Sequence, residues 1–253
     1  MIKHYLKVAF RNLMKYKTQS LVSIIGLAVG FTCFALSALW IRYEMTYDNF
    51  HEGAERIYLV RAHYANEPGT SKFTPYPLMK YLQDKMPEIE AVTAFTAHHV
   101  KFRMEDTEQE IGMIAADSVF MNFFDIQLLK GTVNFLKCDG QEVAITKEFA
   151  KRLFSKEEDA LGKEVEVGRR VCKIGAIVSG WSNHSNIPYN ILAPARHSPR
   201  WGSSNEQLFI RVRERTDIDA FRTKMSTVCI NDIEKESELS DLLITRMSAL
   251  RYS

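Results

Sequence analysis

The feature that most constrains this chain is a stretch of 24 residues without a single charge, from Thr18 to Ile41. As a helix rising 1.5 Å per residue it would be about 36 Å long, enough to cross a hydrocarbon core of about 30 Å. The apolar region of a cleaved signal peptide is only about 7–15 residues long, although Ala35-Leu36-Ser37 imitates a cleavage site. A buried core helix is the other alternative. The length and the basic flank favour an uncleaved transmembrane helix over residues 18–41.

Charge is distributed unevenly about this span. Residues 1–41 hold no acidic residue and five basic ones, whereas the rest of the chain carries 28 Lys and Arg against 31 Asp and Glu. A nucleic-acid-binding protein would place its basic surface on the folded domain, so we predict no nucleic-acid partner. The positive-inside rule keeps the N-terminus in the cytoplasm and sends residues 42–253 across the membrane.

Residues 1–17 are predicted to form an amphipathic helix on the cytoplasmic side. Ile2, Tyr5 and Leu6 begin an apolar face at helical spacing, and the basic residues lie on another face. Such a helix lies along the inner leaflet with its cations toward anionic lipid headgroups. The alternative is a solvated basic leader. The residues predicted to contact the membrane surface are Lys3, Lys7, Arg11, Lys15 and Lys17.

Small residues recur along one side of the span at intervals of 3, 4, 3 and 4. They are Ser23, Gly26, Gly30, Cys33 and Ser37, and Gly26–Gly30 is a GxxxG match. Small residues let helix backbones approach closely in lipid, where no hydrophobic force drives association. We therefore predict that this face packs on another membrane helix. No second apolar run in this sequence is long enough to span, so the partner helix is expected from elsewhere.

The exported body is predicted to be α+β. Hydrophobic periodicity switches between strand and helix spacing near both ends of the body. The segments are a strand at Arg56–Tyr64, a helix at Pro75–Met86 and a strand at Ile89–His99, then a strand at Gln207–Arg213, a helix from Thr216 to about Cys229 and a strand at Leu242–Met247. Two β-α-β units at the ends of one domain suggest a split ferredoxin-like sandwich.

The sequence between these units has a different texture, with short strands and short helices separated by turns. The expected strands are Val100–Met104, Glu110–Ala115, Val143–Thr146, Lys163–Val167 and Val171–Ser179, and the expected helices are Ser118–Phe124 and Lys147–Phe154. Gly162 and Gly168 mark turns about one of the strands. We interpret residues 100–190 as an inserted β-rich subdomain, flanked by halves at residues 50–100 and 190–250.

No catalytic motif is present. Gly162-Lys163 is followed by Glu164 and lacks the upstream glycine of a Walker loop, so we predict that ATP is not hydrolysed by this chain. There is no G-x-S-x-G elbow and no HExxH pair. His98 and His99 are adjacent, and neighbours in a strand point to opposite faces, which argues against a shared metal. We predict no catalytic residue, no metal and no cofactor.

The remaining polar and thiol residues carry little chemistry. His184 lies in the polar loop 183–186, where turn formation explains it better than base catalysis, and Asn183-His184-Ser185 is also a glycosylation match. The cysteines Cys33, Cys138, Cys172 and Cys229 show no paired spacing. One bridge, Cys138–Cys172 or Cys172–Cys229, could form in an oxidising compartment, and the spacing does not choose between them.

The order of segments, together with several motifs, resembles the MacB/FtsX-family ABC transporter permeases. The opening residues 6–13 (LKVAFRNL), residues 25–30 (IGLAVG) and residues 47–51 (YDNFH) look like the start of these permeases. Further motifs resemble their periplasmic core domain: residues 86–92 (MPEIEAV), 143–150 (VAITKEFA), 161–165 (LGKEV) and 175–178 (GAIV).

The resemblance implies a fold and a mechanism. The periplasmic domain would consist of porter-like β-α-β halves, at residues 50–100 and 190–250, with the β-rich insertion between them. ATP-driven dimerisation of a partner ABC ATPase would be transmitted through membrane helices to periplasmic conformational work such as efflux or export. Family permeases continue into three further spans, which would be supplied in cis or in trans. A homodimer or permease pair, a periplasmic adaptor and the bacterial inner membrane are also implied.

A second interpretation belongs to another class of protein. In it the chain is a membrane-anchored periplasmic binding or sensing module that acts without an ATPase. Such a module would need a folded, partner-binding domain and no helix-packing face on the span. Replacement of Gly26 and Gly30 by Leu distinguishes the two in part, because only the permease needs the small-residue face for its membrane partners.

Overall fold

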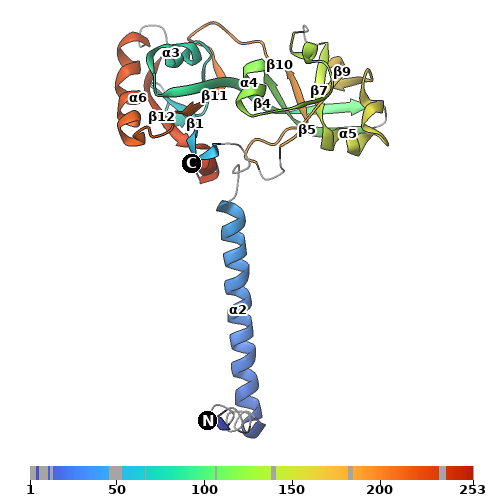
Figure 1. Cartoon of the computed structure of the whole chain (residues 1–253), viewed down its shortest axis with the longest axis vertical. Helices are drawn as coiled ribbons and strands as arrows, with labels where there is room; N and C mark the ends of the chain where they lie inside the picture. Colours follow the sequence, from blue (N-terminus) through green and yellow to red (C-terminus); the bar gives the residue numbers. More distant parts are fainter. Residues whose placement is uncertain are drawn as a thin grey trace. The chain divides into compact units, whose positions relative to one another are not determined.

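The computed structural model describes residues 4–5, 11, 14–45, 53–65, 67–105, 107–137, 141–181, 185–233 and 238–252, with the backbone alone at 45, 228–233 and 251–252. The chain divides into two compact units, Met1–Thr46 and Tyr47–Ser253 (Figure 1). Each unit has its own structure and is treated separately below.

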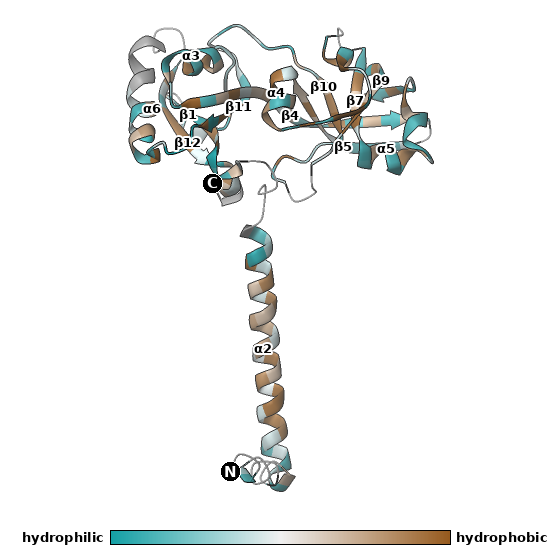
Figure 2. Cartoon of the chain, viewed as in Figure 1, coloured by the Kyte–Doolittle hydropathy of each residue, from teal (hydrophilic) through white to brown (hydrophobic). Residues whose placement is uncertain are grey.

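The first unit is dominated by one long helix, α2 (Lys17–Met45). In Figure 2 the colouring by residue hydropathy marks apolar residues along α2 and hydrophilic ones near its two ends. By length and composition residues Lys17–Glu44 could cross a membrane, and none of the most apolar part is buried within the described structure. The span predicted at residues 18–41 is thus one helix that continues by one residue at its start and four at its end.

The amphipathic helix predicted for residues 1–17 lies mostly outside the described residues. Within it His4, Tyr5, Arg11 and the pair Met14–Lys15 have helical backbone and exposed side chains, and a bend at Tyr16 precedes α2. Its placement along a membrane surface stays a prediction.

The second unit is built on the two predicted β-α-β units. They are β1 (Ile57–Tyr64), α3 (Pro77–Lys85) and β4 (Ile89–Met104), then β11 (Ser204–Val212), α6 (Ile218–Ile233) and β12 (Leu239–Arg246). The strands pair antiparallel in the order β12-β1-β11-β4. This is the order of a ferredoxin-like sandwich, and it confirms the mixed α+β fold class.

Both long helices cover one face of this four-stranded sheet. Alternate residues of β1 (Tyr58, Val60 and Ala62) pack with Leu82 of α3 and Phe221 of α6 in one buried cluster. The period of two along a strand directs the intervening residues to the other face, where they pack against α4 (Ser118–Phe123) in a second cluster. The sequence periodicity therefore assigns both layers.

One prediction about the strands was wrong. The segments Ile89–His99 and Val100–Met104 form a single strand of 16 residues, β4, rather than two strands in separate subdomains. No Gly or Pro interrupts residues 89–104, so nothing ends the extended backbone between them. The strand carries hydrogen bonding from the ferredoxin-like sheet directly into the β-rich region.

In that region the pairing of strands closes on itself. The members are the distal half of β4, β5 (Thr107–Ala116), β10 (Ile191–Pro194), β7 (Glu142–Thr146), β9 (Arg170–Val178) and β8 (Glu164–Val167). Each is hydrogen-bonded to the next, and β8 pairs with both β9 and β4. Parallel pairs (β5 with β10, β7 with β9) occur among antiparallel ones. We call this closed circuit the six-strand ring.

The ring encloses a third hydrophobic cluster. Phe102 of β4, Val143 of β7 and Ile174 of β9 are buried in it, together with Phe149 from α5 (Lys147–Leu153), the helix that follows β7. Phe102 and Phe149 meet edge to face, with ring centroids 5.1 Å apart. Closing a sheet removes its unpaired edges and shields the side chains within.

Two strands of the β-rich region were not predicted, β10 and β6 (Leu128–Gly131). Both have four residues, and β6 pairs only with β9 among the described strands. Two further two-residue strands, β2 (Thr70–Ser71) and β3 (Thr74–Pro75), pair with β1 and β11. Single 3-10 turns lie at residues 54–56, 133–136 and 157–160, and a longer one at 247–252.

Candidate functional site

The small-residue side of α2 is open in the described structure. A Cβ atom placed on Gly26 or Gly30 would meet no atom within 4 Å, and Cys33 is exposed. Thr32 satisfies its own hydroxyl by donating to the carbonyl oxygen of Ala28, 2.8 Å away. Ser23 and Ser37 are exposed on the same side. The five predicted packing residues thus share one accessible helix face, and their contact with a second helix remains a prediction.

The predicted membrane-surface cations are described only in part. Arg11, Lys15 and Lys17 are exposed, whereas Lys3 and Lys7 lie outside the described residues. The ammonium of Lys15 lies 5.4 Å from the centroid of the Tyr16 ring. Nothing in the described unit holds these cations away from a lipid surface.

The adjacent histidines and Cys172 lie on strands of the six-strand ring. His98 and His99 are adjacent and exposed in β4, opposite Met113 and Gly112 of β5. No group of three potential metal ligands occurs among the described residues. Cys172 is buried in the ring, and burial raises the pKa of its thiol. The two proposed disulfides stay untested.

Four residues named from the sequence lie where the structure gives no side chain. Asn183 and His184 of the polar loop and Cys138 lie outside the described residues, and the side chain of Cys229 is also not described. The loop residue that follows, Ser185, is buried and accepts a hydrogen bond from the backbone N–H of Ile187 at 3.1 Å. That contact is turn formation, as the sequence favoured for this loop.

A polar cluster that no sequence motif predicted lies between the ferredoxin-like layer and the ring. Nδ1 of His197 lies 3.2 Å from Oε1 of Glu206, and its Nε2 lies 3.9 Å from Oδ2 of Asp117. The imidazole stacks on Tyr76, with centroids 4.0 Å apart. Neither ring nitrogen makes a directed hydrogen bond within the described structure, so the two carboxylates are close neighbours of the imidazole without being its hydrogen-bond partners. We call these four residues the junction cluster.

Four different elements position the junction cluster. Tyr76 directly precedes α3, Asp117 caps α4, His197 lies in the connection after β10, and Glu206 belongs to β11. The side chain of Asp117 accepts from the backbone N–H groups of Val119 and Phe120 at 2.9 and 3.1 Å. Burial, and then the charges of Asp117 and Glu206, raise the pKa of Tyr76. The cluster joins residues from the two parts of the unit.

An aromatic groove adjoins this cluster on the outer side of α3. It is about 860 Å³ in volume, and Tyr81 and Trp201 face each other across it edge to face, with centroids 6.2 Å apart. Met79 and Pro199 complete its apolar lining. Both rings are half-buried, and aromatic side chains that line a groove are typical of protein-binding patches. Sequence reasoning missed the groove because Pro199 and Trp201 approach α3 from a loop more than a hundred residues away.

A comparison with protein families gives one match. The family described as "MacB-like periplasmic core domain" matches residues 20–228, from within α2 to within α6. No curated protein matches the chain.

Solved structures with the same fold come from permeases and transporters. A domain of a permease protein from Porphyromonas gingivalis matches with a TM-score of 0.62 at 19% identity, covering 78% of this chain and 92% of that one. The extracellular domain of the noncanonic ABC-type transporter YknZ from Gram-positive bacteria matches with 0.53 at 13%, covering 75% and 99%. The periplasmic region of MacB from Actinobacillus actinomycetemcomitans matches with 0.55 at 13%, covering 79% and 92%. At these identities the similarity establishes the fold.

Proposed function

The chain belongs to the MacB-like periplasmic core domain family, and on that premise we propose that it works as the N-terminal part of a permease that couples ATP hydrolysis in the cytoplasm to conformational work in the periplasm. Its domain is of the ABC-transporter permease type. A permease component of this family is not itself an enzyme. Hydrolysis would take place in a partner ABC ATPase, and the work would be efflux or export.

One observation carries the proposal. The family match spans residues 20–228, from inside α2 through β1 to α6, which supports treating the apolar helix and the second unit as parts of one family unit. A tether of unrelated origin would fall outside such a match. The open face with Gly26 and Gly30 gives this helix a surface for further permease spans.

The location follows from the same features. We propose that α2 lies in the bacterial inner membrane with the N-terminus in the cytoplasm and residues 42–253 in the periplasm, because the cations precede the span. Within the periplasmic part we propose porter-like halves at residues 50–100 and 190–250 and an inserted β-rich subdomain at about 100–190. The first 17 residues would lie on anionic lipid.

The partners would be further permease spans, an ABC ATPase and a second permease copy. The aromatic groove beside α3 supports a periplasmic protein partner such as an adaptor, since the half-buried amphipathic rings of Tyr81 and Trp201 line it. The same groove is the observation that favours the alternative function, an anchored binding or sensing module, because partner binding at the groove needs no ATPase.

Purification from native membranes separates the two functions. The full chain, tagged at its C-terminus and extracted in mild detergent, should bring down a protein with a Walker loop, identified by mass spectrometry. Replacing Gly26 and Gly30 by Leu should strip that partner, because two Leu side chains keep the helices apart. The matched control is Ala28→Leu with Ala35→Leu, which adds the same bulk on the opposite side of α2 and should keep the partner.

Two results would count against the permease. Purification without any ATPase, from membranes in which the chain is folded, favours the anchored module. Equal recovery of the ATPase with the Gly26/Gly30 and Ala28/Ala35 variants would mean that the small-residue face is not needed to bind the membrane partners.

A further inference from the structure

The six-strand ring has a cavity at its mouth to which every one of its strands contributes. The volume is about 360 Å³. The contributors are His98 of β4, Met113 of β5, Ala193 of β10, Val143 of β7, Val167 of β8 and Cys172 of β9. Ligand sites in proteins begin at about 300 Å³ and occur in the mouths of closed sheets. The cavity is therefore large enough for a small molecule.

The floor of this cavity is apolar because it is the open end of the ring's hydrophobic cluster. Val143, Cys172 and Ala193 belong to that cluster, and Met113 packs against it. Met113 shares a strand face with the buried Ile111, two residues earlier, as the period of two requires. The displacement of water from such a floor by an apolar group is favourable, because it removes apolar surface from water.

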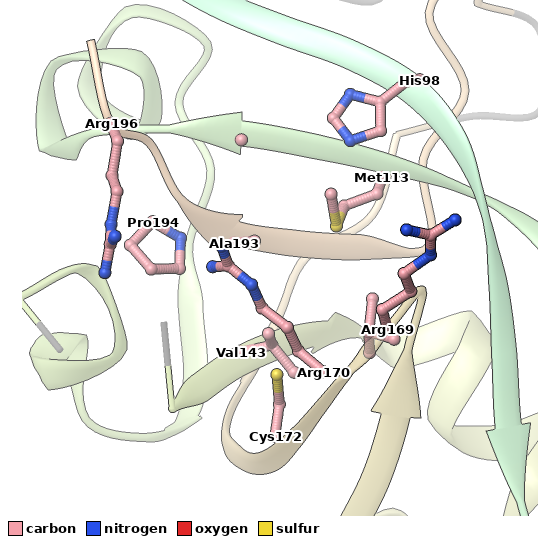
Figure 3. A pocket seen from close by; sticks show the side chains of 11 residues that line it. His98, Met113, Val143, Arg169, Arg170, Cys172, Ala193, Pro194 and Arg196 are labelled. Carbon is pink, nitrogen blue, oxygen red and sulfur yellow. The ribbon is translucent and has the colours of Figure 1, made fainter. Parts of the chain in front are cut away.

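The rim of the cavity is cationic. Arg169 and Arg170 stand at the β8–β9 turn, and Arg196 follows β10. Figure 3 shows the guanidinium group of Arg170 between the side chains of Arg196 and Arg169 in the same view. No Asp or Glu is among the described residues that line the cavity. Arg169 and Arg170 are exposed and form no ion pair with a described residue.

The backbone fixes where these two arginines stand. Gly168 adopts the left-handed conformation, with φ of 64°, that a tight turn between β8 and β9 requires. Its N–H donates to the carbonyl oxygen of Lys101 in β4 at 2.7 Å, which ties the turn to the ring. Arg170 then lies on the same strand face as Cys172 and Ile174, so its side chain starts toward the mouth. A fixed turn lowers the entropy lost when the arginines bind.

We propose that the ring mouth binds a small anionic amphiphile, whose carboxylate or phosphate pairs with Arg169 and Arg170 while its hydrocarbon part lies on the floor formed by Met113, Ala115 and Ala193. Guanidinium groups present forked donors that suit carboxylate and phosphate oxygens. Arg169 and Arg170, with no carboxylate among the described lining residues, repel a cationic ligand, and a bare anion would leave water on the apolar floor. The proposal does not rest on ATP coupling.

The test uses the full chain in nanodiscs of zwitterionic lipid, with octyl phosphate as the probe. Equilibrium dialysis, with empty discs subtracted, should give saturable binding. Hydrogen exchange should slow in the peptides that contain residues 168–172 and 191–196. Arg169→Gln with Arg170→Gln should weaken binding by about tenfold or more, since two charge-assisted contacts are lost. Arg200→Gln with Arg222→Gln removes the same charge from exposed positions outside the cavity and should leave binding unchanged.

Three further probes identify the ligand chemistry. Each of them should bind at least about tenfold more weakly than octyl phosphate. Inorganic phosphate lacks the hydrocarbon tail, octanol lacks the charge, and octyltrimethylammonium carries a positive charge instead of a negative one. Equal binding of inorganic phosphate would make the rim a plain anion site and overturn the amphiphile. If octanol or octyltrimethylammonium bound as tightly as octyl phosphate, the arginines would have no role in binding. The same would follow if octyl phosphate bound the Arg169/Arg170 variant as tightly as the parent. Replacement of Ala115 by Leu should fill the floor, weaken the binding of octyl phosphate and leave that of inorganic phosphate unchanged.

Discussion

The imidazole of His197 lies flat on the phenol ring of Tyr76, with ring centroids 4.0 Å apart and planes 5° from parallel. Tyr76 directly precedes α3 of the ferredoxin-like layer, and His197 lies in the connection from β10 of the ring to β11. The stacked pair therefore joins the two parts of the second unit at a position where Glu206 and Asp117 flank the histidine.

Replacement of His197 by Ala should lower the free energy of unfolding by about 1–2 kcal/mol, since stacking and packing are lost at a nearly buried site. Replacement by Phe keeps the stacked ring and should cost less. Urea unfolding of the full chain in detergent, followed by the fluorescence of Trp181 and Trp201, measures both. His99→Ala, exposed on β4, is the control and should stay within about 0.5 kcal/mol of the parent. Equal losses for His197 and His99 would mean that the stacked pair contributes nothing.

Gly131 should tolerate no side chain. Its φ is 85°, and an added Cβ would lie 2.2 Å from the carbonyl oxygen of Gly175 in β9. Gly131→Ala is expected to cost about 3 kcal/mol or more, as strain and backbone displacement add. Gly162 has a similar φ of 78° but open space around its Cβ position, so Gly162→Ala should cost only about 1 kcal/mol. Thermal unfolding measures both variants. Equal decreases in melting temperature would contradict the close approach of β6 to β9.

Asp117 should act as the N-cap of α4. Its carboxylate accepts from the N–H groups of Val119 and Phe120, so Asp117→Ala should cost about 1 kcal/mol. Asn keeps an acceptor oxygen in the same place, and Asp117→Asn should cost less than half as much. Urea unfolding distinguishes the two. If the Asn variant were as unstable as the Ala variant, the stabilising effect of Asp117 would come from its charge beside His197 and not from capping of α4.

The pair Glu88–Lys224 should make stability depend on pH. Lys224 of α6 donates to Glu88 at 2.6 Å, and this hydrogen bond holds the pKa of the carboxyl below its ordinary value of 4.5. A lowered folded-state pKa gives stability that is fully present above 4.5 and is lost as the pH falls through the folded value. Because both groups are partly exposed, we expect only about 0.5–1 kcal/mol.

Lys224→Met provides the measurement for this pair. The difference in unfolding free energy between parent and variant should be constant from pH 7 to about pH 5 and should shrink below the ordinary glutamate pKa. Arg222→Met, on the same helix and paired with the exposed Asp219, is the matched control and should show a smaller difference. A difference for Lys224→Met that grows on acidification has the wrong sign for this account.

Local patterns explain why so much of the architecture could be predicted. The uncharged run at residues 18–41 needs no tertiary information, because length and charge alone decide whether a helix can span a bilayer. The β-α-β units likewise follow from hydrophobic period, with Pro77 in the first turn of α3 and Pro87 just beyond its end. The strands and helices of both layers of the sandwich can therefore be predicted from short stretches of sequence.

The remaining strands depend on partners far away in the chain. β10 has four residues, Ile191–Pro194, and its extended backbone is stabilised by β5 on one side and β7 on the other. A run of this length carries too few periods to distinguish strand from loop. The continuity of β4 was missed for a related reason, since its burial changes along its length while its hydrogen bonding does not.

The candidate sites were even less accessible from the sequence. The junction cluster gathers residues 76, 117, 197 and 206, and the ring cavity draws on six strands. The one local signal was the adjacent pair Arg169-Arg170 after a turn glycine, but a doublet of this kind is ordinary on a surface. Its meaning depends on the apolar floor opposite, which only the closed pairing of β4 and β8 creates.

Coupling across the membrane is the central claim, and hydrogen exchange of the exported domain measures it most directly. The full chain is purified with its membrane partners, placed in nanodiscs, and compared with ATP plus vanadate and with ADP. We predict that exchange in peptides of the periplasmic unit, those around Tyr76 and His197 above all, changes with the nucleotide, and that the Gly26→Leu, Gly30→Leu variant abolishes the change. Identical exchange in both nucleotide states, in a preparation that hydrolyses ATP, would contradict the coupling and leave an anchored binding module.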